Sequence, residues 1–265
     1  NVAQLVLGPI LAAGTNSPLL FGRRLWAETR IPLFEQACDD RPPSFQLRSD
    51  PGRVFFGCDW AKGSISDIFR ENLSYFRALV GTDLSEDSLD VLASGKTPEL
   101  KALRLHGGTI YRWNRPCYGI SESGKPHLRI ELRALPSGPT VVDQVANAAL
   151  WLGLMVELGH TLPDAASLLS FEDARSNFYA AAKDGIDAQF IWKGGTRMSA
   201  RDLLVRELIP LAEEGLTRAG TNAADIARYM GVLRARIAGG VTVMRSTLPP
   251  ASVTSRSRWP VPPIR

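Results

Sequence analysis

The sequence predicts an α+β protein in which strand-forming segments come first and helices follow. The middle of the chain contains β-branched and aromatic runs with period-two alternation, and the segment after Pro139 shows helical periodicity with repeated capping signals. Strands followed by a run of helices are typical of α+β domains. The composition, with 45% hydrophobic and 22% charged residues, excludes collagen, coiled coil and disorder as descriptions of the whole chain.

Short apolar and amphipathic segments make up the first hundred residues. Residues 4–11 form an apolar run that we interpret as a buried strand, and turn-forming residues follow it at 14–18. Apolar residues at helical spacing predict two helices, at residues 25–38 and 64–80. Residues 54–56 are interpreted as a short strand. Two polar stretches are expected to be connections, at residues 39–52 and 82–101.

The central segment carries the clearest strand signal. Residues 109–113 are rich in β-branched and aromatic side chains, and residues 116–126 are interpreted as a Gly/Ser/Pro connection. Residues 127–134 then alternate strictly between polar and apolar side chains. Because successive side chains of a strand point to opposite faces, the alternation places four polar groups on one face. These groups are His127, Arg129, Glu131 and Arg133.

Residues 140–238 are predicted to be helical. Each helix start is marked by a short capping residue followed three positions later by Asp, which complements the positive end of the helix dipole. The expected pairs are Thr140/Asp143, Thr161/Asp164, Ser170/Asp173, Ser199/Asp202 and Asn222/Asp225. Pro210 is expected to kink the helix that begins at Ser199.

Charge and cysteine content narrow the classes of function. The chain has 31 basic and 27 acidic side chains, and the four arginines of residues 245–265 account for the whole excess. A neutral body argues against a nucleic-acid-binding protein. The absence of a run of 18 apolar residues argues against a membrane protein. Three scattered cysteines and three scattered histidines predict a reduced, cytoplasmic protein and argue against a structural zinc site.

The charged strand face is the first candidate site. It is either a solvated surface, on which Arg–Glu pairs contribute little, or a carboxylate that holds Mg²⁺ beside guanidinium groups that hold phosphate or carboxylate. Residues 111–116 place two arginines among aromatic side chains, for cation–π packing or for ligand binding. Residues 15–18 with Arg23, Arg24 and Arg30 form either a plain turn and helix or part of a substrate site.

Three blocks of sequence, taken together and in order, resemble the glutamate–cysteine ligase type 2 family of carboxylate–amine ligases. Residues 11–22 (LAAGTNSPLLFG), with ETR at 28–30, resemble its SANSP block. Residues 108–116 (GTIYRWNRP) resemble its arginine strand. Residues 127–133 (HLRIELR), followed by GPT at 138–140 and VAN at 145–147, resemble its EIR block. The resemblance covers residues 1–238.

The resemblance implies a curved antiparallel sheet, related to that of glutamine synthetase, with helices outside it. It also implies chemistry with ATP and Mg²⁺, in which a carboxylate, typically that of glutamate, forms an acyl phosphate and an amine then forms the amide. Glu131 would be the metal ligand and, with Arg133, catalytic. The implied substrate-binding residues are Arg112, Arg115, Arg129, Arg30, Ser17 and Asn16. The implied partners are small-molecule substrates, without nucleic acid or membrane, and a homo-oligomer stays an open alternative.

The two ends of the chain depart from the family pattern. No paired-glutamate strand precedes Asn1, so we expect residues 1–244 to be the C-terminal portion of a longer catalytic domain. Residues 245–265 are expected to be a disordered, basic, Pro-rich tail. The alternative interpretation of the same chain is a non-catalytic, ligase-like scaffold or fragment that binds nucleotide or a partner.

Overall fold

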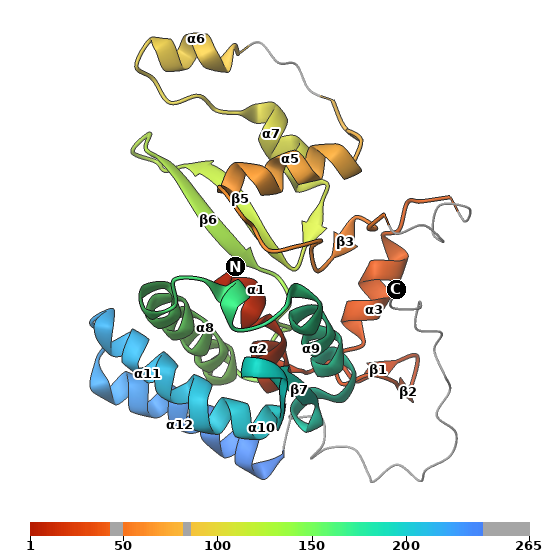
Figure 1. The fold of residues 1–265 in the computed structure, drawn as a ribbon, viewed down its shortest axis with the longest axis vertical. Coiled ribbons are helices and arrows are strands. Elements are labelled where there is room, and N and C mark those ends of the chain that lie inside the picture. The colour runs from red at the N-terminus through yellow and green to blue at the C-terminus, as the bar shows by residue number, and fades with distance from the viewer. Residues whose placement is uncertain (43–49, 82–85, 241–265) are drawn as a thin grey trace. The chain divides into compact units, whose positions relative to one another are not determined.

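The computed structural model describes residues 1–42, 50–81 and 86–240, which form a mixed helix and strand protein (Figure 1). The described chain divides into two compact units, and each is described by itself. Unit 1 contains Asn1–Leu33 and the described residues from Ala134 onward, and unit 2 contains Phe34–Arg133. The predicted catalytic domain, residues 1–244, stays a prediction, and the predicted tail, residues 245–265, lies outside the described residues.

Unit 1 is built around α2 (Leu7–Gly14), in which every residue is buried. It follows α1 (Val2–Leu5) and packs mainly against α9 (Phe171–Asp184). The strand predicted at residues 4–11 is therefore wrong. A short continuous apolar run fits a buried helix as well as a buried strand, so periodicity alone cannot separate them. The close approach explains Gly8, where a Cβ would lie 2.9 Å from the backbone of Asn177.

The long helix α8 (Val141–Thr161) crosses α11 (Ile209–Arg218) at two glycines. A Cβ at Gly215 would lie 1.9 Å from the carbonyl oxygen of Gly153, so only glycine allows this approach. By length and composition α8 alone among the described helices is able to cross a membrane, but buried core helices meet the same criteria. Its buried Glu157 binds Arg218 of α11, as a core helix requires.

The capping signals mark four helix starts correctly. The side chains of Thr140, Ser170, Ser199 and Asn222 each accept a backbone N–H at the start of a helix. The expected start at Thr161 is wrong because that residue ends α8, and Asp164 caps a short 3-10 turn, η1 (Ala165–Ser167), instead. Pro210 lies in the first turn of α11, where a proline is tolerated, and the expected kink stays a prediction. A π-helical turn, η4 (Leu204–Leu208), comes just before it, between α10 (Ala200–Leu203) and α11.

Residues 140–238, which were predicted to be helical, also contain an antiparallel hairpin that the helical periodicity did not indicate. Its strands β7 (Gln189–Trp192) and β8 (Thr196–Ser199) are joined by η3 (Lys193–Gly195). A second small hairpin pairs β1 (Leu19–Leu20) with β2 (Arg23–Arg24) before α3 (Arg30–Ala37). The remaining elements of unit 1 are η2 (Gly185–Asp187) and α12 (Ala223–Gly239).

Unit 2 combines short helices with four strands. The predicted strand near residue 55 is confirmed as β3 (Val54–Phe55), which pairs in parallel with β4 (Tyr111–Arg112). The predicted helix after residue 64 is α5 (Ile65–Tyr75), which Ser64 and Asp67 start with a reciprocal capping box. Two shorter helices follow at α6 (Ser88–Ala93) and α7 (Lys101–Gly108).

The central feature of unit 2 is the antiparallel hairpin of β5 (Asn114–Ile120) and β6 (Pro126–Leu132). The connection predicted at residues 116–126 is therefore wrong over its first half, because β5 continues through Pro116 and Gly119. The described strands pair two by two in four small sheets, and the curved antiparallel sheet that the resemblance implies stays a prediction.

Candidate functional site

The register of the β5–β6 hairpin places the predicted polar residues on one face. Arg115 is opposite Glu131, Cys117 is opposite Arg129, and Gly119 is opposite His127. Directly opposed residues of an antiparallel pair share a face, so the alternation predicted for β6 is confirmed and β5 adds a further arginine to it. We call the face with Arg115, Cys117, His127, Arg129 and Glu131 the charged face.

Glu131 lies between two arginines on this face. Its Oε2 accepts hydrogen bonds from Arg115 Nε at 3.0 Å and Nη2 at 2.7 Å, and its Oε1 lies 3.4 Å from Arg133 Nε. Partial burial acts to raise the pKa of Glu131, but the hydrogen bond from Arg115 and the charges of Arg115 and Arg133 outweigh it and hold this pKa below the ordinary value. The carboxylate is therefore ionised at neutral pH, and Oε1 is its less engaged oxygen.

Both arginines are themselves held in place. Arg115 donates through Nη1 to the carbonyl oxygen of Gly107, and the guanidinium of Arg133 lies over the ring of Tyr111, 3.7 Å from its centroid. The Glu131 carboxylate thus sits in a fixed cationic frame rather than in a mobile surface pair.

Arg112 has a different environment from the other predicted arginines. Its side chain is 7% exposed, donates to Asn72 Oδ1 at 2.9 Å and Glu71 Oε1 at 2.6 Å, and lies 4.6 Å from the centroid of the Phe55 ring. All of these groups belong to the interior of unit 2. Of the two interpretations of Arg112 from the sequence, cation–π packing and ligand binding, the structure shows the cation–π packing. The substrate-binding role of Arg112 stays a prediction.

The predicted residues of unit 1 gather around a carboxylate that the sequence did not single out as a site residue. Glu28 accepts from the backbone N–H of Asn16 at 2.9 Å, from the Ser17 hydroxyl at 2.5 Å and from Arg30 Nε at 3.2 Å. Arg30 also donates to the carbonyl oxygen of Ala134, and Asn16 Nδ2 donates to that of Ser137 at 2.9 Å. This network fixes the segment that directly follows Arg133 in the sequence.

The predicted site residues thus fall into two groups. Arg115, Glu131 and Arg133 contact one another in unit 2, with Arg129 on the same face, whereas Asn16, Ser17 and Arg30 contact one another in unit 1. Sequence reasoning missed Glu28, Glu71 and Asn72 as partners. Glu28 precedes Arg30 in the first family block, and Glu71 and Asn72 lie in the polar run of residues 70–72, but neither signal reveals which groups these side chains bind.

The charged face offers one carboxylate to a metal ion. No group of three His, Cys, Asp or Glu side chains that could hold a metal occurs in the described parts of the chain. Mg²⁺ commonly takes one or two carboxylates and completes its shell with water and phosphate oxygens. Glu131 therefore fits a cation that arrives with a phosphate ligand, and does not form an all-protein site.

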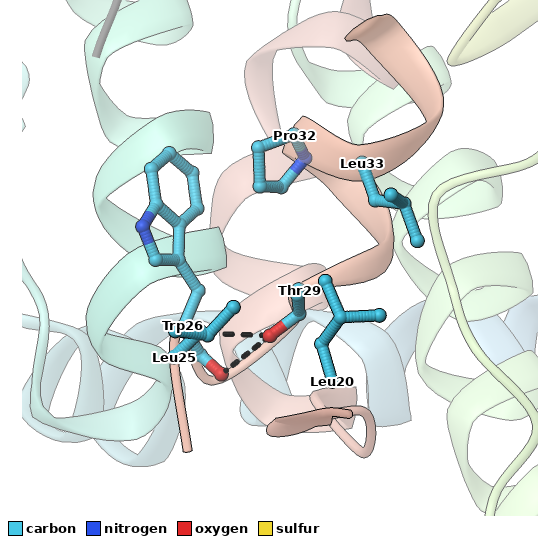
Figure 2. Close-up of a pocket in the computed structure, with 6 residues that line it drawn as sticks. All are labelled: Leu20, Leu25, Trp26, Thr29, Pro32 and Leu33. Atoms are coloured by element: carbon cyan, nitrogen blue, oxygen red, sulfur yellow. Dashed lines mark hydrogen bonds between the residues drawn. The ribbon is translucent and has the colours of Figure 1, made fainter. Parts of the chain in front are cut away.

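A small pocket in unit 1 is too small to hold a substrate. Figure 2 shows its lining residues, which are Leu20, Leu25, Trp26, Thr29, Pro32 and Leu33. Its volume is about 10 Å³, which leaves room for one water molecule at most. The Thr29 hydroxyl is already paired with the backbone N–H and carbonyl oxygen of Trp26.

Comparison with known proteins assigns the chain to a class of enzymes. The sequence model of glutamate-cysteine ligase family 2 matches residues 1–250, which is most of the chain. A search of curated proteins finds no significant match. The class is that of the ligases, and the chain belongs to glutamate-cysteine ligase family 2. The resemblance seen in the three sequence blocks is thereby confirmed.

Proposed function

We propose that this protein is an ATP-dependent carboxylate–amine ligase that uses Mg²⁺. One observation carries the proposal: in a chain of this ligase family, Glu131 is held ionised between Arg115 and Arg133 on one strand face. A carboxylate beside fixed guanidinium groups suits a reaction in which negatively charged species must be held close together. We propose glutamate as the acyl donor because the chain belongs to glutamate-cysteine ligase family 2.

The residues of the charged face have complementary roles in this proposal. When bound, ATP would supply the γ-phosphoryl group that activates the carboxylate as an acyl phosphate, with ADP leaving, and Mg²⁺ would neutralise charge on the phosphates. Glu131 offers Oε1 to the divalent cation, and Arg133 and Arg115 neutralise the anions beside it. Arg115 is already ordered by Glu131 and Gly107, so little further ordering is needed when an anion binds near its positive charge.

The network around Glu28 is proposed to position backbone groups of unit 1 for substrate binding. Asn16, Ser17 and Arg30 would act by holding the segment from Ala134 to Ser137, since their polar groups already bind Glu28 or the backbone of that segment. We also propose that the β5–β6 hairpin belongs to a curved antiparallel sheet of the glutamine-synthetase type.

The test is ADP release from Mg-ATP in the presence of glutamate and a panel of amines. The wild-type protein is expected to release ADP only when both a carboxylate and an amine are present. Glu131→Gln removes the charge that would bind the cation and is expected to lower the rate by about 100-fold or more. Glu122→Gln, at the exposed turn of the same hairpin, is the matched control and keeps the rate. Equal rates in the wild type and Glu131→Gln would refute the role of Glu131.

A non-catalytic scaffold is the second candidate, and one observation favours it: the described residues offer a metal a single carboxylate on the charged face. A scaffold would bind Mg-ATP in calorimetry without releasing ADP under any combination of substrates. Turnover that requires both substrates would exclude it.

A further inference from the structure

One side of the long helix α8 is apolar along its whole length and lies outside the core of unit 1. Six residues at alternating spacings of four and three form this side, which we call the seam: Val141, Val145, Ala148, Leu152, Met155 and Gly159. Val141, Val145 and Leu152 are 74%, 38% and 56% exposed. An unbroken repeat of this spacing places one apolar stripe along a helix, and such a stripe is typical of a surface that packs against another helix.

The opposite side of α8 already has its partners within unit 1. The buried residues of the helix lie there, and α8 packs against α11 and α12 (Figure 1). On that side the buried Glu157 is paired with Arg218, which ties α8 into the core of unit 1. The helix is therefore apolar on two sides, which explains why its composition resembles that of a membrane span.

The chemistry of the seam fits a copy of itself. It has no charged side chain, hydroxyl or amide, so a nucleic acid or a charged peptide would find no group to pair with. A two-fold axis relates identical surfaces, so a helix face that meets its own copy must be self-complementary. When two α8 helices run antiparallel about an axis between Ala148 and Ala149, small residues meet at the axis and allow close approach. The facing pairs are then Ala148 with Ala149, Val145 with Leu152 and Val141 with Val156.

We propose that the seam of α8 is a docking surface for a second copy of this chain, with the two helices antiparallel about this axis. A helix of 21 residues is about 32 Å long and roughly 10 Å wide, so the seam offers about 300 Å² per copy. This is the size of the apolar patches that mark interaction sites, and less than half the roughly 800 Å² per partner of a standard interface. The dimer is therefore expected to be weak and to dissociate on dilution.

The test is sedimentation velocity of the full chain over a concentration series from about 1 to 100 μM. The wild type is expected to shift from monomer to dimer as the concentration rises. Leu152→Glu places a charge against Val145 of the second copy and is expected to weaken association at least roughly tenfold. Val205→Glu changes an exposed valine of unit 1 outside the seam, so it is the matched control and is expected to associate like the wild type. Circular dichroism checks that each variant is folded.

A charge pair tests the antiparallel register. Val145→Lys alone, like Leu152→Glu alone, is expected to weaken the dimer. The double variant places each introduced lysine opposite an introduced glutamate of the second copy, so association is expected to return toward that of the wild type. A double variant that stays monomeric would reject the antiparallel pairing.

A cysteine at the axis gives an independent readout. In a Cys58→Ser background, which removes the exposed native thiol, Ala148→Cys is expected to form a disulfide between copies under mild oxidation. Ala224→Cys, at an exposed alanine of α12, is the matched control and is expected to stay unlinked.

Two results would overturn the proposal: a wild type that stays monomeric throughout the series, or a Leu152→Glu variant that associates like the wild type. A monomeric wild type that sediments with phosphatidylcholine vesicles, and loses this binding in Leu152→Glu, would assign the seam to a membrane surface and reject the dimer. No substrate is present in these measurements, so their outcome is independent of the ligase function.

Discussion

Glu28 in unit 1 and Glu131 in unit 2 are both carboxylates beside arginines, yet their surroundings differ. The Glu28 side chain is 0% exposed and accepts from three donors. The Glu131 side chain is 39% exposed, and among the described residues its Oε1 is paired with the Arg133 guanidinium alone, at 3.4 Å. The first carboxylate has its hydrogen-bonding capacity filled by the protein, while the second keeps capacity for a ligand.

This difference separates a structural carboxylate from a binding one. Burying a charge is costly unless hydrogen bonds and an opposite charge compensate it. The three donors around Glu28 provide this compensation, and these interactions also hold the surrounding backbone in place. A partly exposed ion pair contributes little to stability, so the Arg115–Glu131–Arg133 cluster is not explained by stability. The same contrast holds among the arginines of unit 2, where Arg112 is enclosed by Glu71 and Asn72 and Arg129 lines an open groove.

The largest expected effect is the loss of the buried carboxylate. Glu28→Gln leaves Arg30 without its buried counter-charge and turns an amide N–H₂ toward existing donors. Its unfolding free energy should fall by about 3 kcal/mol, measured by urea denaturation. Glu131→Gln in the same assay should lose less than about 1 kcal/mol. Equal losses would remove the distinction between the two carboxylates.

A second substitution applies the contrast within unit 2. Arg112→Gln breaks a nearly enclosed ion pair with Glu71 and the hydrogen bond to Asn72, so it should cost about 2–3 kcal/mol of unfolding free energy. Arg129→Gln, on the exposed strand face, should change stability by less than about 0.5 kcal/mol. A stable Arg112→Gln protein would place Arg112 among the ligand-binding arginines instead.

The smallest expected effect is the pH dependence of the Glu131 cluster. The pKa of Glu131 is lower in the folded protein than in the unfolded chain, so its contribution is present above the ordinary carboxyl range and is lost as pH falls through about 4 and below. The stability difference between the wild type and Glu131→Gln should therefore shrink on acidification. If the stability difference between the wild type and Glu131→Gln grew as pH falls, it would contradict the stabilisation of the ionised Glu131 carboxylate by Arg115 and Arg133.

The sequence was sufficient for β6 with its polar face and for four helix starts, because alternation and capping are local signals. It was insufficient for α2, where a buried helix has no polar side to reveal its period, and for β5, where Pro116 and Gly119 resemble a loop. The hairpin of β7 and β8 was missed because four-residue strands are too short to show alternation. Arg112 depends on Glu71 and Asn72, about 40 residues away in the sequence, and a local sequence pattern cannot identify such partners.

The most direct measurement of the central claim is Mn²⁺ binding in the presence of ATP, followed by electron paramagnetic resonance. If Glu131 is the cation-binding carboxylate, Glu131→Gln weakens the Mn²⁺–nucleotide complex by roughly tenfold or more, while Glu122→Gln binds like the wild type. Mn²⁺–ATP affinity in Glu131→Gln equal to that of the wild type would contradict the account.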